Sequence, residues 1–340
     1  MAQQRVSRSG LDVLARAAGL DAQGSAQLLD DARALPTAVE WRQTLQRFAG
    51  IAGVLALGFG AVFFIAANWS ALTPGGRLWL LQGLFLIAIA AALWRPPPQV
   101  LGRSALLLAF IGAGALFALF GQTFQTGADV YELFVLWTLL GLPLVFAARW
   151  SPVTAAWLLV GNVALALFCG VVPAQHPLWM LLGFDERSWA LRMLIAMLPN
   201  LLLWGAAEWQ AMRDPALELL LPRWLRRLLL LAGLGYGTLA AFVAILDSHR
   251  QATMVLPLFL VSAVAVGAFC LRFRREALGP VALAASAVVL GLAVLMEIIP
   301  SGAQELSLLL LPLWVVVASG AAGVVLVPLV RRWEGDSHEA

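Results

Sequence analysis

Lysine is absent from this sequence of 340 residues, so all 22 basic residues are arginine. The chain therefore has no lysine for a Schiff base and no P-loop lysine, and reactions that depend on those groups are excluded. Charged residues of all kinds make up only 12% of the chain, against roughly 25% in soluble domains. So few charges cannot cover a surface that faces water on all sides, which indicates that the solvent is a lipid bilayer.

Cysteine and histidine are also scarce. The two cysteines, Cys169 and Cys270, each lie in an apolar run, where we expect buried thiols that behave as small hydrophobic side chains. The histidines His176, His249 and His338 are scattered and form no H-E-x-x-H pair. The sequence therefore predicts no disulfide framework, no metal site and no cofactor.

The sequence consists mainly of long apolar runs. Hydrophobic residues make up 61% of the chain, and the mean hydropathy is +0.87. A helix needs about 20 apolar residues to cross roughly 30 Å of hydrocarbon. Ten runs approach or exceed this length: Phe48–Ala67, Leu78–Trp94, Ser104–Phe120, Tyr131–Ala148, Pro152–Val172, Trp189–Ala207, Arg227–Leu246, Thr253–Leu271, Leu278–Ile299 and Leu306–Val330. The predicted fold is an all-α, polytopic transmembrane helix bundle of about ten spans.

The arginines predict the orientation of these spans, because cytoplasmic loops are enriched in basic residues. With a cytoplasmic N-terminus, only Arg77, Arg187, Arg192 and Arg250 lie outside, and the other 18 of the 22 arginines lie inside. We therefore expect both termini to be cytoplasmic. The arginines form no single patch, so no nucleic-acid partner is expected.

Three regions follow from this reading of the chain. Residues 1–47 are expected to be a small cytoplasmic helical segment, residues 48–330 the transmembrane domain, and residues 331–340 a cytoplasmic tail. In the first region, apolar residues between Leu11 and Leu20 predict one short helix, and Ser25–Leu35 predicts a second that ends at Pro36. So few apolar residues favour a docked helical hairpin over an independent domain.

The stretch FGQTFQTGAD, Phe120–Asp129, follows an almost wholly apolar run and is predicted on the outer side. It has two interpretations. In the first, it is a turn: Asp129 and Glu132 form a capping box for the next span, and Gly127 takes a positive φ. Thr123 and Thr126 then bond to the local backbone.

In the second interpretation the stretch binds a ligand. If the preceding helix continues for one more turn, Gln122, Gln125 and Thr126 share a face, and a turn does not need two glutamines. Asn68, at the end of the first span, would join them. The candidate ligand-binding residues are Asn68, Gln122, Thr123, Gln125, Thr126, Asp129 and Glu132. They are expected to bind a polar solute or a lipid headgroup.

Polar residues within the spans are few, and we expect most of them to form interhelical hydrogen bonds. They are Gln82, Asn162, Arg192, Asn200 and Glu297. An ionisable residue in a span marks a functional site by default, although Glu297 lies close enough to a predicted outer end to reach the interface. Asn200 follows Pro199, where a broken helix would expose backbone groups to a substrate.

Two stretches carry a resemblance to a known family. FFIAANW, Phe63–Trp69, and FGQTFQTGADVYELF, Phe120–Phe134, resemble the signature stretches of the bacterial membrane-protein family DUF2157, as does the charged N-terminal segment with Trp41. The resemblance covers roughly the first half of the chain. The family pattern has Tyr at the position of Phe124 and Pro at that of Val130. Without the tyrosine hydroxyl, position 124 is not expected to be catalytic.

The resemblance implies an integral membrane protein of bacteria. Members of the family are often encoded beside a second membrane domain and a small protein with a GDYXXLXY motif, which implies a membrane assembly. No activity, cofactor or substrate is implied.

Three functions remain open. The first is a non-enzymatic component of the bacterial cytoplasmic (inner) membrane that binds or moves a small solute or lipid, with membrane lipids and partner subunits as its partners. The second is a structural or assembly subunit without transport, which the scarcity of intramembrane carboxylates favours. The third is an enzyme acting on lipid-linked substrates, which needs acidic residues or histidine gathered in one place. Asp129, Glu132, Asp185, His176 and Glu305 are predicted on the outer side, but their spacing does not bring them together.

Overall fold

The computed structural model describes residues 11, 15, 18–31, 38–125, 127, 129–173, 175–185, 188–213, 221–247, 249–274, 276–300 and 303–339. Ten helices within these ranges are long and apolar enough to cross a membrane, which confirms the predicted number of spans. The same ranges contain no β-strand, so the predicted all-α class is also confirmed.

The chain divides into two compact units, residues 1–112 and 113–340. The first unit contains α2 (Ala22–Asp31), α3 (Ala38–Ala67), α4 (Pro74–Trp94) and the first half of α5 (Val100–Phe124). The second unit contains the rest of α5 and the following elements: α6 (Val130–Ala148), α7 (Ser151–Gly170), α8 (Pro177–Leu181), α9 (Trp189–Arg213), α10 (Arg223–Asp247), α11 (His249–Phe269), the π-helical turn η2 (Cys270–Arg274), α12 (Leu278–Ile298) and α13 (Gln304–Glu339).

Capping residues explain where several helices begin. The Thr73 side chain accepts a hydrogen bond from the Gly76 amide at 3.1 Å, and Pro74 occupies the first position of α4, where its missing N–H costs nothing. The Asp21 carboxylate accepts from the Gly24 amide at 2.7 Å in the same way. Helix α2 therefore begins at Ala22, three residues before the predicted start at Ser25.

Small residues bring the helices of the first unit together. A Cβ atom on Gly50 would lie 3.1 Å from Ser104 Oγ, and a Cβ atom on Gly58 would lie 3.2 Å from Ile111 Cγ2. Helices α3 and α5 therefore approach closely at these two glycines. Gly112 of α5 faces Phe85 of α4 at ordinary van der Waals distance.

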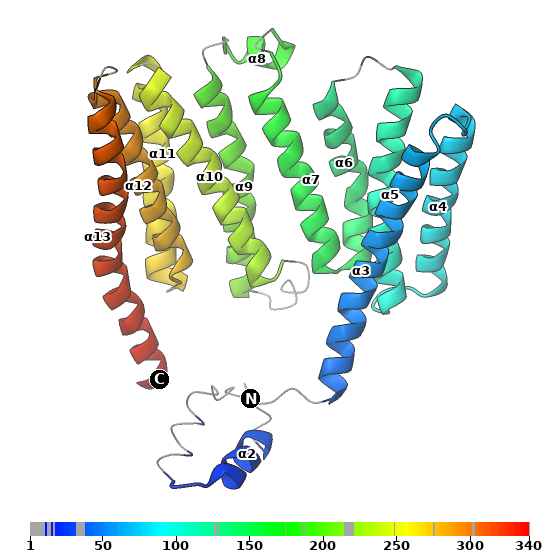
Figure 1. Ribbon diagram of the computed structural model, residues 1–340, viewed down its shortest axis with the longest axis horizontal. Helices are drawn as coiled ribbons and strands as arrows, with labels where there is room; N and C mark the ends of the chain where they lie inside the picture. The colour runs from blue at the N-terminus through cyan, green and yellow to red at the C-terminus, as the bar shows by residue number, and fades with distance from the viewer. Residues whose placement is uncertain are drawn as a thin grey trace. The chain divides into compact units, whose positions relative to one another are not determined.

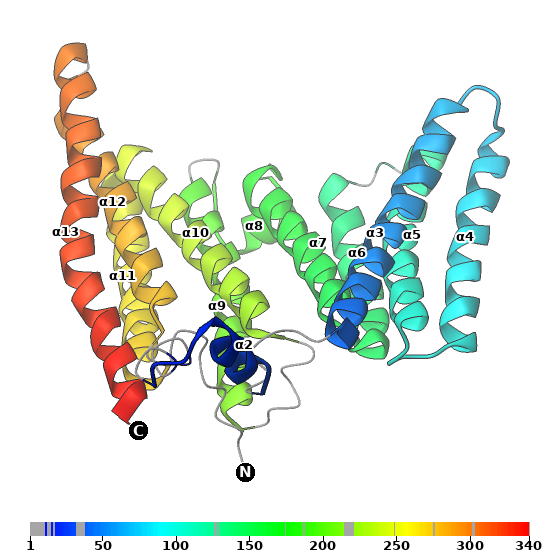
Figure 2. The same cartoon turned by 60° about the horizontal axis from the view of Figure 1, so that its bottom comes forward.

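Helices α9 and α10 form the centre of the second unit (Figures 1 and 2). Helix α7 packs against α9 on one side, and α11 and α12 pack against α10 on the other. The largest buried side chain in this unit is that of Trp179 in α8, which packs with Met193 and Met197 of α9. Small residues of α10, among them Ala240 and Ala244, complete this core.

Helix α13 packs against α12 through a tryptophan and a glycine. A Cβ atom on Gly291 would lie 2.1 Å from the Trp314 ring, and the Trp314 indole N–H donates to the Val288 carbonyl at 2.9 Å. No residue of the most apolar 18-residue stretch of α13 is buried. The helix continues to Glu339, so residues 331–339 of the predicted tail extend the last span as helix.

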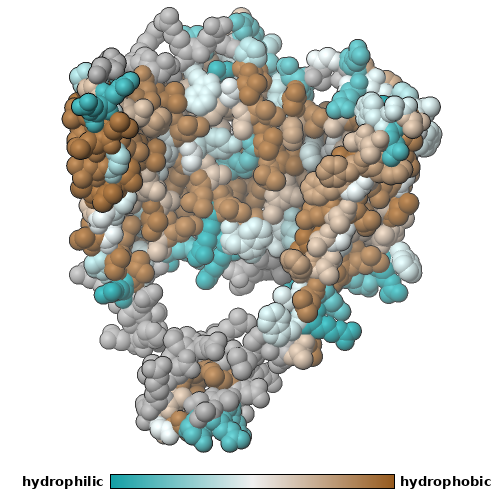
Figure 3. All heavy atoms as spheres, viewed as in Figure 1, coloured by the Kyte–Doolittle hydropathy of each residue, from teal (hydrophilic) through white to brown (hydrophobic). Residues whose placement is uncertain are grey.

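The first membrane-spanning helix also starts earlier than the sequence predicts. Helix α3 begins at Ala38, ten residues before the expected first span, so the predicted boundary at residue 47 lies inside one helix. Leu11 and Ala15 are helical and buried, in agreement with a short helix at this point. On the face shown in Figure 3, hydrophobic residues cover most of the surface of the helices. This is expected of helices surrounded by lipid.

Candidate functional site

The FGQTFQTGAD stretch spans the end of α5 and the connection to α6. Helix α5 ends at Phe124, and Gln125 leaves it in the left-handed region with φ +44°. Gly127 has φ +68°, which confirms the predicted positive φ at this glycine. Helix α5 thus continues for four residues beyond the predicted end of the span at Phe120, so Gln122 lies within it, whereas Gln125 follows its last residue. Thr126 lies outside the described residues.

The expected capping box is also wrong in its hydrogen bonds. Asp129 is the N-cap residue of α6, but its side chain makes no capping hydrogen bond. The Glu132 carboxylate instead accepts from the Tyr131 hydroxyl at 3.5 Å, at the long limit for such a bond. The side chains of Gln122, Gln125, Asp129 and Glu132 are exposed.

The two remaining candidates have different surroundings. Thr123 Oγ1 is buried and has no hydrogen-bond partner among the described residues, so its expected bond to the local backbone is not formed. Asn68 belongs to the first unit, where its backbone N–H and its side-chain amide both donate to the Phe64 carbonyl, at 3.1 and 2.8 Å.

A polar contact that the sequence did not reveal lies where α6 meets the loop before α8. The Tyr131 hydroxyl lies 2.9 Å from His176 Nε2, and the ring of Phe168 packs against both, with centroid distances of 5.1 and 5.5 Å. His176 Nδ1 accepts from the Leu178 amide at 3.3 Å and so caps α8. Tyr131 and His176 are 45 residues apart, and no local signal connects them.

The acidic residues expected on the same side do not all join this contact. Glu132 reaches it through Tyr131, whereas the Asp185 carboxylate accepts from the Ser188 hydroxyl at 2.6 Å. Glu305 lies in the first turn of α13. The structure therefore connects Glu132 with His176 and places Asp185 beside Ser188.

Within the spans, Asn162 of α7 and Asn200 of α9 form an amide pair. Asn200 Nδ2 donates to Asn162 Oδ1 at 2.9 Å and to the Ala196 carbonyl at 3.2 Å. Asn162 Nδ2 donates to the Leu158 carbonyl at 2.9 Å, and the Tyr236 hydroxyl of α10 donates to the Asn162 carbonyl at 3.0 Å. The expected interhelical hydrogen bond is thus confirmed for both asparagines.

Helix α9 continues through Pro199, so the broken helix that the sequence offered as an alternative is wrong. Proline has no N–H and cannot donate to the carbonyl four residues earlier, that of Ile195. Next to this position, the Asn200 side chain donates to the Ala196 carbonyl.

The amide pair lies on the wall of a cavity of about 290 Å³ between α6, α7, α9 and α10, called here the amide cavity. Its lining residues are Val135, Thr138, Leu139, Trp157, Leu158, Gly161, Asn162, Ala164, Leu165, Phe168, Pro199, Asn200, Leu203 and Leu229. None of these side chains is ionisable. Ligand pockets typically measure about 300–1,000 Å³ and are mostly apolar with a few placed polar groups, and the volume of the amide cavity lies just below that range.

The hydroxyl and indole donors on the cavity wall, those of Thr138 and Trp157, are already committed within the protein. The Thr138 hydroxyl donates to the Phe134 carbonyl at 2.7 Å, and the Trp157 indole N–H donates to the Thr138 carbonyl at 2.8 Å.

A second cavity of about 480 Å³ lies between α7 and α10 and shares Asn162, with Tyr236 also on its wall. The amide pair therefore borders two apolar spaces.

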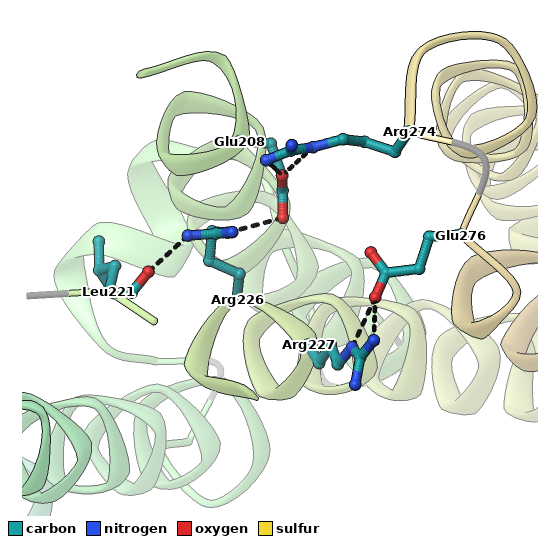
Figure 4. Close-up of polar contacts among 6 residues, drawn as sticks. All are labelled: Glu208, Leu221, Arg226, Arg227, Arg274 and Glu276. Carbon is teal, nitrogen blue, oxygen red and sulfur yellow. Dashed lines mark hydrogen bonds and ion pairs between the residues drawn. The ribbon is translucent and has the colours of Figure 1, made fainter. Parts of the chain in front are cut away.

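A buried ion cluster lies near the end of α9, at the start of α10 and at the end of η2 (Figure 4). The Glu208 carboxylate of α9 accepts from Arg226 Nε at 2.8 Å and from Arg274 Nε at 2.5 Å. Nearby, Arg227 Nε donates to Glu276 at 2.5 Å, and the Arg226 guanidinium also donates to the Leu221 carbonyl at 2.7 Å. Glu208 and Arg226 are almost completely buried.

The other polar residues of the spans are placed as follows. Arg192 is buried and donates to the Val172 carbonyl at 2.7 Å, with its guanidinium 5.7 Å from the centre of the Trp179 ring. Gln82 is exposed, and Glu297 is exposed in the last turn of α12. Cys169 and Cys270 are buried free thiols, as predicted. The described residues contain no group of three or more His, Cys, Asp or Glu side chains arranged to hold a metal.

Comparison with known proteins gives one match. The model of a family described as "Predicted membrane protein (DUF2157)" matches residues 13–154, a range that includes α6 and the start of α7. No curated protein and no solved structure matches the chain. Both stretches that suggested the resemblance, residues 63–69 and 120–134, lie inside the matched range. Over residues 13–154 the chain therefore matches the family of predicted membrane proteins DUF2157.

Proposed function

We propose that the protein is a non-enzymatic, multi-pass component of the bacterial cytoplasmic (inner) membrane, and that it binds or moves a small solute or lipid in the amide cavity. The observation that carries this proposal is the cavity itself, an apolar space of about 290 Å³ with two asparagine side chains on its wall. Its location among four candidate spans gives a molecule dissolved in the bilayer a short route into it.

The chemistry of the lining favours binding over catalysis. General acid–base and nucleophilic catalysis need an ionisable or activated side chain close to the substrate. The lining offers amides, one indole and one hydroxyl, and the Thr138 hydroxyl is committed to the Phe134 carbonyl. These groups can orient a ligand, but they cannot readily transfer its protons.

The experiment compares the wild type with a variant whose cavity is filled. A Cβ atom on Gly161 would lie 3.5 Å from Thr138 Cγ2, so a side chain at this position extends into the cavity without a backbone clash. Native mass spectrometry of protein extracted gently with its own lipids should find a defined small molecule on the wild type. The Gly161→Leu variant should lack that molecule.

Two controls make the result specific. Gly205→Leu places the same side chain on α9 at a position with no atom within 4 Å, and it should keep the ligand. The Gln122→Ala/Gln125→Ala variant should also keep it, because these exposed residues are not among those that line the amide cavity. Loss of the ligand from that double variant alone would move the binding site to the α5–α6 turn.

A structural or assembly subunit is the second candidate function, and the ion cluster favours it. Ion-coupled carriers usually need a buried carboxylate that can change its partner. Within the described spans, Glu208 is buried and held by two arginines, whereas Glu132 and Glu297 are exposed. If the wild type carries only bulk lipid or partner proteins, and no defined ligand, this second function is the correct one.

A further inference from the structure

On the wall of the amide cavity, the Asn200 side-chain oxygen accepts no hydrogen bond from the described residues. Asn200 is 2% exposed, and the two hydrogens of its Nδ2 are donated to Asn162 Oδ1 and to the Ala196 carbonyl. These two acceptors fix which end of the carboxamide is nitrogen, so the oxygen points away from them. Among the described residues, none donates a hydrogen bond to Asn200 Oδ1, although an amide oxygen can accept two.

Asn200 Oδ1 is not among the fully buried side-chain atoms without a partner in the described part of the chain, so it is accessible to a molecule in the cavity. Thr138 and Trp157 cannot satisfy Asn200 Oδ1, because their hydrogens are donated to the Phe134 and Thr138 carbonyls. A group that enters the cavity and donates a hydrogen bond would supply the partner that Asn200 Oδ1 lacks. The protein therefore presents an acceptor to whatever occupies this space.

Asn162 offers the complementary group. One hydrogen of its Nδ2 is donated to the Leu158 carbonyl, and the second is not used in any described contact. The paired amides thus present one free acceptor and one free donor. A hydroxyl group both donates and accepts, so it suits this pair better than an ether or a ketone, which only accept.

The rest of the lining determines the charge and shape of the occupant. No arginine, histidine, aspartate or glutamate lines the cavity, so a charged headgroup would be buried there without a counter-ion. Leu139, Leu203 and Phe168 are among the apolar side chains that remain for a hydrocarbon part.

From these contacts we infer that the amide cavity binds an uncharged amphiphile whose hydroxyl group donates to Asn200 Oδ1 and whose hydrocarbon part packs against the apolar wall. The inference rests on the proposed function and names the ligand class of that same site. Long-chain alcohols are the simplest members of this class.

The test uses three probes of equal chain length that differ only at the head: a primary alcohol, its methyl ether and the matching carboxylate. Each competes with a photoreactive long-chain alcohol for the full-length protein in nanodiscs, and mass spectrometry maps the labelled residues. We expect labelling of the cavity wall, and displacement by the alcohol at roughly one-tenth of the ether concentration, because one hydrogen bond is worth about that factor.

Variants locate the effect. Asn200→Leu is similar in size and lacks the acceptor, so alcohol and ether should compete equally. Ser286→Ala removes a buried hydroxyl that bonds Thr238 at 2.7 Å, away from the cavity, and should keep the preference for alcohol. If Asn200→Leu does not fold, the alcohol and ether comparison on the wild type still decides the question.

The outcomes separate the two proposals. Equal competition by alcohol and ether, with labelling still on the cavity wall, overturns the hydroxyl inference and leaves the proposed function intact. Stronger competition by the carboxylate overturns the uncharged class. If no probe labels the cavity wall and Gly161→Leu changes nothing, the proposed function itself is wrong.

Discussion

Two guanidinium groups contact the carboxylate of Glu208, and this small cluster joins three elements of the second unit. Arg226 is 18 residues from Glu208 along the chain, and Arg274 is 66 residues from it. The sequence identified both arginines only as flanks of spans, because charge counting locates basic residues at a membrane face without assigning their partners. The pairing depends on how α9, α10 and η2 pack.

Removing the charge of Glu208 should therefore strongly destabilise the protein. Glu208→Gln leaves two guanidinium groups beside a neutral amide, and one of them, Arg226, is 2% exposed. Breaking a buried pair by removing one partner typically costs about 3–5 kcal/mol. Thermal unfolding in detergent should show a clear decrease in the midpoint.

Glu276→Gln is the matched control, because its partner Arg227 is 50% exposed. Exposed pairs contribute roughly 0–1 kcal/mol, so the unfolding midpoint of this variant should stay close to that of the wild type. Equal decreases in the two variants would contradict a special role for the buried cluster.

The amide pair shows what residue-level prediction can and cannot find. Asparagine in an apolar span predicts an interhelical hydrogen bond, and the bond between Asn162 and Asn200 confirms it. The partner and the cavity beside it were not predictable, because 38 residues separate the two asparagines and the void depends on the side chains around them.

At the scale of elements, the spans could be predicted because their length and apolar composition are imposed by the bilayer. Their ends were less predictable. Helix α3 starts at Ala38, since the polar residues before Phe48 are also compatible with a helix and the apolar run marks only its membrane-embedded part. The five-residue helix α8 was missed, because its stability comes from the His176 cap and the buried Trp179 and not from a periodic pattern.

The turn after α5 shows why the candidate site changed. The pattern Asp129-x-x-Glu132 located the start of α6 correctly, but the Glu132 side chain contacts Tyr131 instead of reaching back to the cap. Tyr131 also contacts His176, and a contact across 45 residues carries no sequence signal.

The contact between α12 and α13 gives a prediction at this scale. A methyl group added at Gly291 would overlap the Trp314 ring at 2.1 Å, and an indole that is also hydrogen-bonded to Val288 cannot move aside easily. Gly291→Ala should destabilise this helix pair by about 1–3 kcal/mol. The measurement is thermal unfolding together with limited proteolysis of α13.

Gly320→Ala tests the same change in open space, because no atom lies within 4 Å of the added carbon. Alanine is the better helix former, so this variant should be as stable as the wild type or slightly more stable. A stable Gly291→Ala variant with unchanged proteolysis would show that α13 does not depend on this contact.

At the scale of the whole molecule, the arginine distribution leads us to propose that both termini are cytoplasmic. The loop between α3 and α4 would then lie outside, and the loop between α4 and α5 inside. Ser70→Cys and Gln99→Cys place a thiol in these two loops at exposed positions. A membrane-impermeant maleimide added to intact cells should label Ser70→Cys, and Gln99→Cys should react only after permeabilisation.

The wild type supplies the background for this experiment. Cys169 and Cys270 are 0% and 3% exposed, so the unmodified protein should remain unlabelled. The opposite labelling pattern would invert the proposed orientation and place the Glu208 cluster at the outer face.

The packing of the helices against one another was not predictable from the sequence. In a soluble protein the polar stripe of each helix indicates which face is exposed, but lipid tails are as apolar as leucine, so this signal is weak in a membrane. Both the buried and the exposed sides of these spans are rich in leucine, valine and alanine. The centre of the second unit at α9 and α10 therefore emerges only from the structure.

The position of α13 has a consequence for how the protein is made. A ribosome releases the chain N-terminus first, at about 5–20 residues per second, so α13 follows every other described helix into the membrane. The core around Trp179, Met197 and Ala240 contains no residue of α13, and all of its members have already been synthesised by then. Assembly of that core need not wait for α13, which can be added to a finished bundle as its outermost layer.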